Sequence, residues 1–269
     1  MPHGRFKSFR CALAGVHAVE SDTRHVFPRH THDQFGIGVI RRGAQKSYSG
    51  RGMVEAECGD TITVNPGEVH DGAPIGDDGR SWRILYVDPS VVADVAADIS
   101  EGKMRLYEFA NPVIKSRHLS ACFETLFCAV TSDPARAALR REELFLTLLQ
   151  SAMCERNKSS GRPSVPNAIS TAKSLIDDDP ASPITLEQLA RASGLSRFQV
   201  LRGFVRATGL TPHAYLVQRR IDMVRRLIAR GAPLAQASAE GGFADQSHMT
   251  RIFRRTYGIS PRVYAHAVM

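Results

Sequence analysis

Three histidines near the beginning of the chain have the residue type and spacing to bind a metal ion or a small polar molecule. His30 and His32 are separated by one residue, and His70 follows in a later segment. Because side chains alternate along a β-strand, His30 and His32 are expected to point to the same side. Three neutral imidazoles can bind zinc, iron or nickel and leave a coordination position open. They can equally hydrogen-bond a carboxylate or a hydroxyl group of an organic ligand.

The segments around these histidines have the pattern of β-strands. Phe35, Ile37 and Val39 alternate with small residues, which predicts that their side chains lie on the face opposite to the histidine pair. Turn signals rich in glycine, proline and aspartate recur at intervals of about ten residues up to residue 90. Many short strands at this spacing favour a small barrel or a sandwich.

Helical patterns follow the β-rich segment. Apolar residues recur at helical spacing over 119–127 and again over 139–149, so this pair of amphipathic helices either packs on the barrel or pairs with a second subunit. The stretch 157–167 is rich in serine, glycine, proline and asparagine and is expected to be a linker. The predicted domains are an all-β barrel over 1–95, a helical connector over 96–160 and an all-α domain over 166–269.

The composition excludes several classes of protein. Of the 269 residues, 43% are apolar and 23% are charged, which is typical of a chain with a buried core. Five cysteines without a C-x-x-C pair argue against a disulfide scaffold or zinc knuckle and favour a reducing cytoplasm. The uncharged run from Cys11 to Val19 is too short to span a bilayer, and the polar His17 within it argues against a signal peptide. We therefore expect a cytoplasmic protein without a membrane partner.

The positive charge is concentrated in the second part of the chain. The formal net charge is +8, yet residues 1–162 hold 21 Lys and Arg against 20 Asp and Glu. Residues 163–269 hold 14 against 7. A basic module in a cytoplasmic protein favours a polyanionic partner, usually nucleic acid.

The basic module contains an internal repeat. The segment Leu186–Tyr215 is repeated as Leu234–Tyr264, with one inserted residue. The matched pairs are Gly194 with Gly242, Leu195 with Phe243, Phe204 with Phe253, Gly209 with Gly258, and Pro212 with Pro261. A short helix, a turn with glycine and a second helix are typical of a helix-turn-helix, so the sequence predicts two such units.

Each predicted second helix has one apolar and one basic face. On a helical wheel the polar side of 196–206 carries Gln199, Arg202 and Arg206. The polar side of 245–256 carries Ser247, His248, Arg251, Arg254 and Arg255. Arginine can pair bidentately with guanine and glutamine with adenine, so both faces are candidates for the major groove. The alternative is that these arginines are only solvated, and their occurrence at matched positions in a basic module favours DNA.

Residues 168–268 resemble the DNA-binding domain of AraC-type transcription regulators. The resemblance is carried by Gly242-Phe243, Ser247, Arg251, Phe253, Gly258, Ser260-Pro261 and Tyr264, and by Arg220-Ile221 and Leu227-Ile228 in a central helix. It implies seven helices, with recognition helices at about 196–207 and 245–256. It also implies that Phe198, Leu201, Arg202, Gln246, Ser247, His248 and Arg251 face the groove. Two departures are Leu201, where a polar residue is common, and Ala265, which replaces a usual basic residue.

Residues 28–43 and 59–72 resemble the two sequence motifs of cupin barrels, and AraC-type regulators commonly carry a cupin-like effector domain. The resemblance implies a barrel that binds a small molecule through His30, His32, Gln34 and His70. Metal-binding cupins usually add a carboxylate shortly after the histidine pair, where this chain has Gly36 and Ile37. We therefore expect an organic effector and no cofactor, with a divalent metal on the three histidines as the alternative.

Together these patterns predict a ligand-responsive regulator that binds promoter DNA as a homodimer and contacts RNA polymerase. The sequence contains no nucleophile elbow, phosphate-cradling loop or redox cysteine pair, so no enzymatic activity is expected. One alternative is a metal-dependent cupin enzyme fused to a DNA-binding domain. A second is a constitutive DNA-binding protein whose barrel only dimerises.

Overall fold

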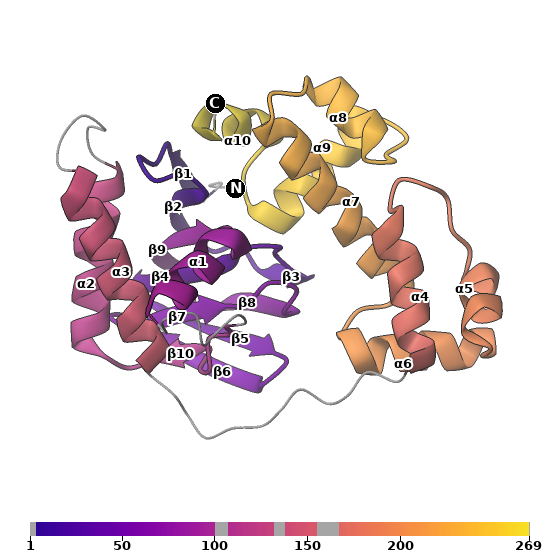
Figure 1. Cartoon of the computed structure of the whole chain (residues 1–269), viewed down its shortest axis with the longest axis horizontal. Coiled ribbons are helices and arrows are strands. Elements are labelled where there is room, and N and C mark those ends of the chain that lie inside the picture. The colour runs from indigo at the N-terminus through magenta and orange to yellow at the C-terminus, as the bar shows by residue number, and fades with distance from the viewer. Residues whose placement is uncertain (1–3, 100–106, 132–137, 155–166, 269) are drawn as a thin grey trace. The chain divides into compact units, whose positions relative to one another are not determined.

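The computed structural model describes residues 4–99, 107–131, 138–154 and 167–268. Nearly all of the predicted linker over 157–167 lies outside the described residues. The chain divides into two compact units, residues 1–159 and residues 160–267, which are coloured indigo to magenta and orange to yellow in Figure 1. No helix among the described residues is long and apolar enough to cross a membrane.

The first unit is built on two antiparallel sheets. Its strands are β1 Arg5–Phe9, β2 Val16–Thr23, β3 Phe27–His30, β4 Phe35–Arg42, β5 Ala44–Ser49, β6 Gly52–Glu57, β7 Thr61–Val64, β8 His70–Ile75, β9 Arg80–Val87 and β10 Val113–Ile114. The six-stranded sheet has the order β1-β2-β9-β4-β7-β10, and the four-stranded sheet has the order β3-β8-β5-β6. This arrangement confirms the predicted β-rich first domain.

Strand β4 separates two apolar cores. Phe35, Ile37 and Val39 pack in one core with the helices, whereas Ile40 packs in a second core with side chains of both sheets. The predicted alternation in β4 is therefore confirmed. Gly38 is required by close packing of β4 on β9, because a Cβ atom there would lie 2.5 Å from the carbonyl oxygen of Arg83.

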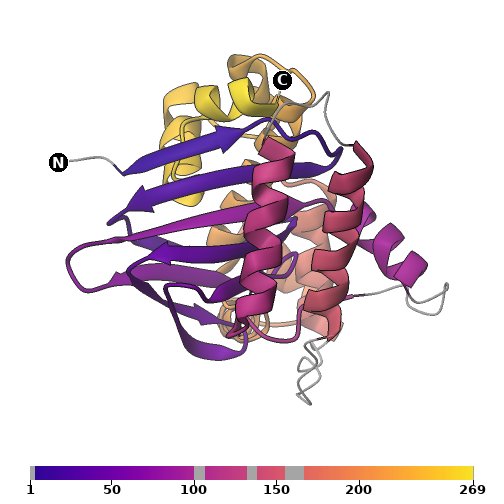
Figure 2. The same cartoon turned by 90° about the vertical axis from the view of Figure 1, so that its left-hand side faces the viewer.

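Three helices complete the first unit: α1 Pro89–Ile99, α2 Arg117–Thr131 and α3 Ala138–Cys154. Figure 2 shows α2 and α3 side by side across one face of the six-stranded sheet. Phe123 and Phe127 of α2 and Leu148 of α3 are buried in the same core as Ile37. Of the two possibilities that the sequence leaves open for these helices, packing on the sheet is therefore the one observed within a single chain.

The second unit contains seven described helices, as the family resemblance implies. They are α4 Asn167–Asp178, α5 Leu186–Ser193, α6 Arg197–Thr208, α7 Pro212–Ala229, α8 Leu234–Glu240, α9 Gln246–Tyr257 and α10 Pro261–Val268. Helix pairs α5–α6 and α8–α9 form the two predicted helix-turn-helix units, and α7 joins them. Gly194 and Gly242, which occupy matched positions in the turns, both have a left-handed backbone.

Candidate DNA-binding and ligand-binding sites

Helix α6 begins at a well-formed N-cap. The backbone N–H of Gln199 donates to the Ser196 hydroxyl at 3.2 Å, and the backbone N–H of Ser196 donates to the Gln199 side-chain oxygen at 2.9 Å. This capping box orients the helix start by satisfying free backbone donors. The oxygen of Gln199 is therefore engaged within the helix, and adenine would have to displace that bond.

The buried and exposed faces of α6 agree with the helical wheel. Val200 and Phe204 are buried, and the predicted residues Phe198, Gln199, Arg202 and Arg206 are all exposed, as are Arg197 and Val205. The Arg202 guanidinium lies 5.6 Å from the centre of the Phe198 ring, and that ring is 64% exposed. A cation over an aromatic face restricts both side chains and leaves them facing solvent. Leu201, the departure from the family pattern, is half-buried.

Helix α9 has the same organisation. Asp245 caps it by accepting the backbone N–H of His248 at 2.7 Å. Met249, Phe253 and Thr256 are buried, whereas Gln246, Ser247, Arg251, Arg254 and Arg255 are exposed. His248 is half-buried, with its ring edge-on to the ring of Phe243 at 5.5 Å. His248 therefore packs partly against Phe243. The other predicted residues of α9 are exposed to solvent.

The arginines on these faces are available to a polyanion. Within the described part of the chain, no carboxylate lies within ion-pair distance of Arg202, Arg206, Arg251 or Arg255. By contrast, the exposed Arg191 on α5 pairs with Glu187 at 3.4 Å. Ala265, the second departure from the family pattern, is buried in α10.

A buried acidic residue links helix α9 to the central helix α7. Asp222 of α7 is fully buried and accepts the Tyr257 hydroxyl of α9 at 2.9 Å and the Gln218 amide at 2.9 Å. The Arg219 guanidinium lies 3.5 Å from its other oxygen and also reaches Asp177 of α4 at 2.9 Å. The sequence analysis did not identify Asp222 or Tyr257. The available signal was a charged residue at a position where the helical period places apolar ones.

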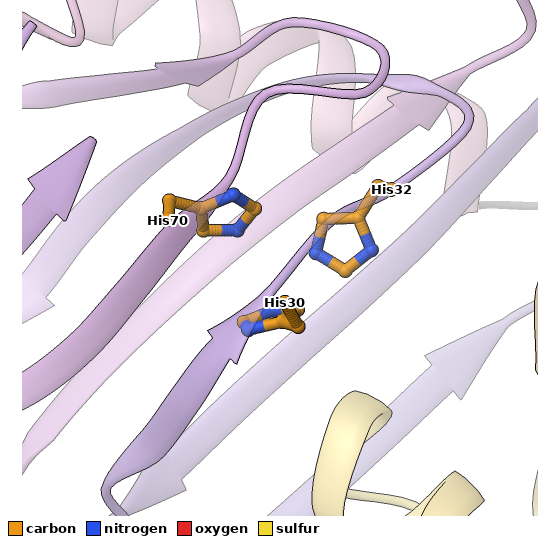
Figure 3. A group of neighbouring side chains, drawn as sticks. All are labelled: His30, His32 and His70. Carbon is orange, nitrogen blue, oxygen red and sulfur yellow. The ribbon is translucent and has the colours of Figure 1, made fainter. Parts of the chain in front are cut away.

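The three histidines converge inside the first unit. His30 ends β3, His32 follows it in the connecting segment, and His70 begins β8 directly opposite His30. One nitrogen from each ring lies within 4.8 Å of the other two, and Figure 3 shows the rings turned toward one another. His30 and His32 are buried, and His70 is partly exposed. The three histidines that the sequence analysis selected therefore lie together.

Backbone carbonyls fix the proton on two of these rings. His30 Nδ1 lies 2.7 Å from the Pro28 carbonyl oxygen, and His70 Nδ1 lies 3.0 Å from that of Glu68. A ring nitrogen that faces a carbonyl carries the proton, so Nε2 carries the lone pair when the ring is neutral. Burial, together with the nearby His70, lowers the pKa of His30 to about 3. Burial also lowers the pKa of His70, so both rings are neutral near pH 7.

Gln34, the fourth residue expected at the ligand site, hydrogen-bonds outside the histidine group. Its side chain is buried and donates to Asp88 Oδ1 at 2.8 Å, just after β9. Gln34 lies between the end of β3 at His30 and the start of β4 at Phe35. The strand period is therefore interrupted between them. Among the described residues, the histidine group has no acidic member.

Comparisons with known proteins agree with this architecture. Residues 14–149 match the AraC-like ligand binding domain, and residues 189–267 match a helix-turn-helix domain. The uncharacterised HTH-type transcriptional regulator YbfI of Bacillus subtilis is 30% identical, over 83% of this chain and 81% of its own. The transcriptional activator RhaS of Klebsiella pneumoniae is 25% identical, over 93% and 92%.

The fold is also found in a solved structure. ToxT of Vibrio cholerae, with an unsaturated fatty acid bound, has a TM-score of 0.59 at 11% identity, covering 99% of this chain and 96% of its own. The matched domains and the coverage of YbfI establish the relationship at the sequence level. The chain belongs to the AraC family of transcription regulators, with a ligand-binding domain followed by a DNA-binding helix-turn-helix domain.

Proposed function

We propose that α6 and α9 insert into two successive major-groove segments of promoter DNA. Arg202 and Arg251, exposed and without a carboxylate partner among the described residues, are the observation that carries this proposal. They occupy corresponding faces of two helices that α7 holds together. Recognition helices contact bases one helical turn apart when both enter the same face of the duplex.

The exposed residues divide by chemistry into base readers and phosphate binders. Arg202 and Arg251 are assigned to guanine, and Phe198 can contact the methyl group of thymine. Gln246 and Ser247 lie in the first turn of α9, where side chains of a recognition helix reach base edges. Gln199 and His248 are assigned lesser roles because each is engaged within the protein. Arg206 and Arg255 lie in the later turns and are assigned to phosphates.

Salt dependence tests the DNA-binding proposal. The full chain is titrated into a labelled duplex that carries the DNA upstream of its own coding sequence, at several salt concentrations between about 50 and 200 mM. Neutralisation of several phosphates predicts an affinity that falls by roughly 10³ over this range. Arg206→Ala should reduce the slope by about one unit, whereas Arg191→Ala, whose side chain is paired with Glu187, should not. An affinity that does not change with salt would contradict the proposal.

The barrel is proposed to bind a small-molecule effector through His30, His32 and His70. The match to an AraC-like ligand binding domain supports this role, as does the fatty acid bound by ToxT. An effector that prefers one arrangement of the two units would change how the DNA-binding units are presented. Its influence cannot exceed its differential affinity for the two arrangements. The barrel is therefore proposed to act by binding and not by catalysis, in keeping with relatives that are transcriptional regulators.

The working state is proposed to be a homodimer that acts in the cytoplasm and recruits RNA polymerase. Leu139 and Leu146 on α3 are 69% and 39% exposed, which supports a subunit contact on this helix. Among the described cysteines, Cys11, Cys58, Cys122 and Cys128 form no disulfide, which is typical of a reducing compartment. RhaS is an activator by name, which supports a polymerase contact. Leu139→Lys should shift the sedimentation of the full chain from dimer to monomer.

A further inference from the structure

The histidine group combines three ligand atoms from three separate positions of the fold. His30 and His70 are opposite one another on paired strands, and His32 reaches the same point from the segment before β4. The ring centres are 4.4 Å apart for His30 and His70, 4.8 Å for His30 and His32, and 5.0 Å for His32 and His70. A buried core is formed mainly by apolar side chains. Three adjacent histidines, each with an imidazole nitrogen that can bind a metal ion, are therefore unusual as core packing alone.

The orientation of the rings matches that of metal ligands. His30 and His70 each donate Nδ1–H to a backbone carbonyl, which fixes the tautomer and leaves Nε2 as an electron-pair donor. This is the outer hydrogen bond that metal-binding histidines almost always make. The rings of His30, His32 and His70 lie beside one another. One electrophile at the centre of the group would accept the lone pairs of His30 and His70 together.

We propose that His30, His32 and His70 bind one divalent transition-metal ion and that the ion presents an open position to the effector. Nitrogen ligands about 2.0–2.1 Å from a tetrahedral ion are roughly 3.3 Å from one another. The ligand atoms of the group are within 4.8 Å of one another, so they would move closer together when an ion binds. Three histidines leave a coordination position for a carboxylate or hydroxyl oxygen of the bound molecule.

The donor set selects among metal ions. Imidazole nitrogen suits zinc, iron, nickel and copper, whereas calcium and magnesium require oxygen ligands. The absence of an acidic ligand, among the described residues, gives the group no net charge to offset the 2+ ion. An anionic effector would supply that charge. The sequence alone favours an organic effector that hydrogen-bonds the histidines directly, because Gly36 and Ile37 stand where metal-binding cupins have a carboxylate. The arrangement of the three rings in the structure favours a metal ion between the histidines and the effector.

Cobalt absorption tests the metal site directly. The full chain is purified without an affinity tag, stripped with a chelator and titrated with Co²⁺ while the visible spectrum is recorded. The expected result is saturation at one ion per chain with the visible bands of nitrogen-ligated Co²⁺. His30→Gln and His70→Gln should each weaken binding by at least tenfold. His25→Gln is the matched control, because His25 is exposed and outside the group, and it should bind as the unaltered chain does.

A second measurement uses the unaltered chain alone, in case a variant does not fold. With ¹⁵N-labelled histidine, Zn²⁺ should shift the resonances of three imidazoles and leave the remaining histidines unchanged. No saturable Co²⁺ binding, or equal binding by His30→Gln and His70→Gln, would overturn the metal site.

The open position has its own test. Acetate, as a simple carboxylate, should change the visible spectrum of the Co²⁺-loaded chain, and an unchanged spectrum would overturn this half of the inference. Only this half rests on the proposed effector role of the barrel. DNA affinity is measured in parallel: salt-dependent DNA binding without Co²⁺ binding refutes the metal site alone, whereas Co²⁺ binding without DNA binding refutes the proposed DNA function alone.

Discussion

The hydroxyl of Tyr257 on α9 donates to the carboxylate of Asp222 on α7 at 2.9 Å. Asp222 is fully buried, so protein donors must replace the water that its carboxylate would otherwise bind. Gln218 and Arg219 of α7 and Tyr257 of α9 are among these donors, so this one carboxylate links α9 to α7. The orientation of the proposed DNA-binding face of α9 therefore depends on a buried contact on its other side.

Tyr257→Phe tests this contact. Removing the hydroxyl leaves a buried, charged acceptor with one donor fewer, so the second unit should lose roughly 1–3 kcal/mol of unfolding free energy. Trp82 is the only tryptophan and lies in the barrel core, so its fluorescence reports the first unit. Far-UV circular dichroism is dominated by the helices, and most of the described helices, α4 to α10, lie in the second unit. In urea, the dichroism transition should move to lower concentration while the fluorescence transition stays in place. Equal movement of both transitions would contradict the assignment.

Arg80 is predicted to be a stability determinant of the barrel. It is 1% exposed, and its guanidinium donates to the Gln45 side-chain oxygen at 3.0 Å and to the carbonyls of His25 and Gly72, both at 3.2 Å. Burial lowers its pKa to about 10, so it remains charged near neutral pH. Arg80→Met would remove the donor from three oxygen acceptors. Each acceptor that water does not reach should lower the free energy of unfolding by about 1–3 kcal/mol. The fluorescence midpoint of Trp82 should fall accordingly.

Arg42→Met is the matched control for Arg80. Arg42 bonds Asp22 at 2.6 Å, but the two side chains are 48% and 54% exposed. An exposed ion pair contributes about 0–1 kcal/mol, so this variant should unfold close to the unaltered chain. If Arg42→Met lowers the free energy of unfolding more than Arg80→Met does, Arg80 is not the stability determinant proposed here.

Gly38→Ala should destabilise the six-stranded sheet. Its Cβ atom would lie 2.5 Å from the Arg83 carbonyl oxygen, which is backbone and can move only if β4 and β9 separate. Overpacking of this kind costs about 1–3 kcal/mol. Gly50→Ala, where nothing lies within 4 Å of the new atom, should cost much less. Urea titrations of the two variants, followed by Trp82 fluorescence, compare them, and equal midpoints would contradict the close approach of the strands.

Local patterns in the sequence predicted the helices and strands, but they did not predict the contacts between residues far apart in the chain. Ser196 and Asp245, taken as the first residues of the recognition helices, are the N-caps that precede them. The helix period also placed Arg202 and Arg251 on the exposed face, because each period acts within one element. Gln34 was selected for its nearness in sequence to the histidine pair, and its hydrogen bond to Asp88, 54 residues away, could not be predicted from a local pattern.

The contacts of Asp222 and Arg80 could not be predicted for a different reason. Tyr257 is 35 residues from Asp222, and Gln45 is 35 residues from Arg80. Each partner is determined by the packing of one element on another, which no local period encodes. The nearness of His30 to His70 was expected only because the two residues lie in the two cupin-like motifs, and the pairing of β3 with β8 that produces it comes from the structure.

Selection of bound sequences from a pool of random duplexes tests the central claim most directly. The full chain, Arg202→Ala, Arg251→Ala and the control Arg191→Ala are each taken through the same selection. The unaltered chain and the control should enrich two short motifs about one helical turn apart. Each recognition variant should lose preference at one motif only, with a cost of about 1–3 kcal/mol on the intact site. Loss of affinity that is equal for all sequences, or the absence of any enriched motif, would contradict base reading by α6 and α9.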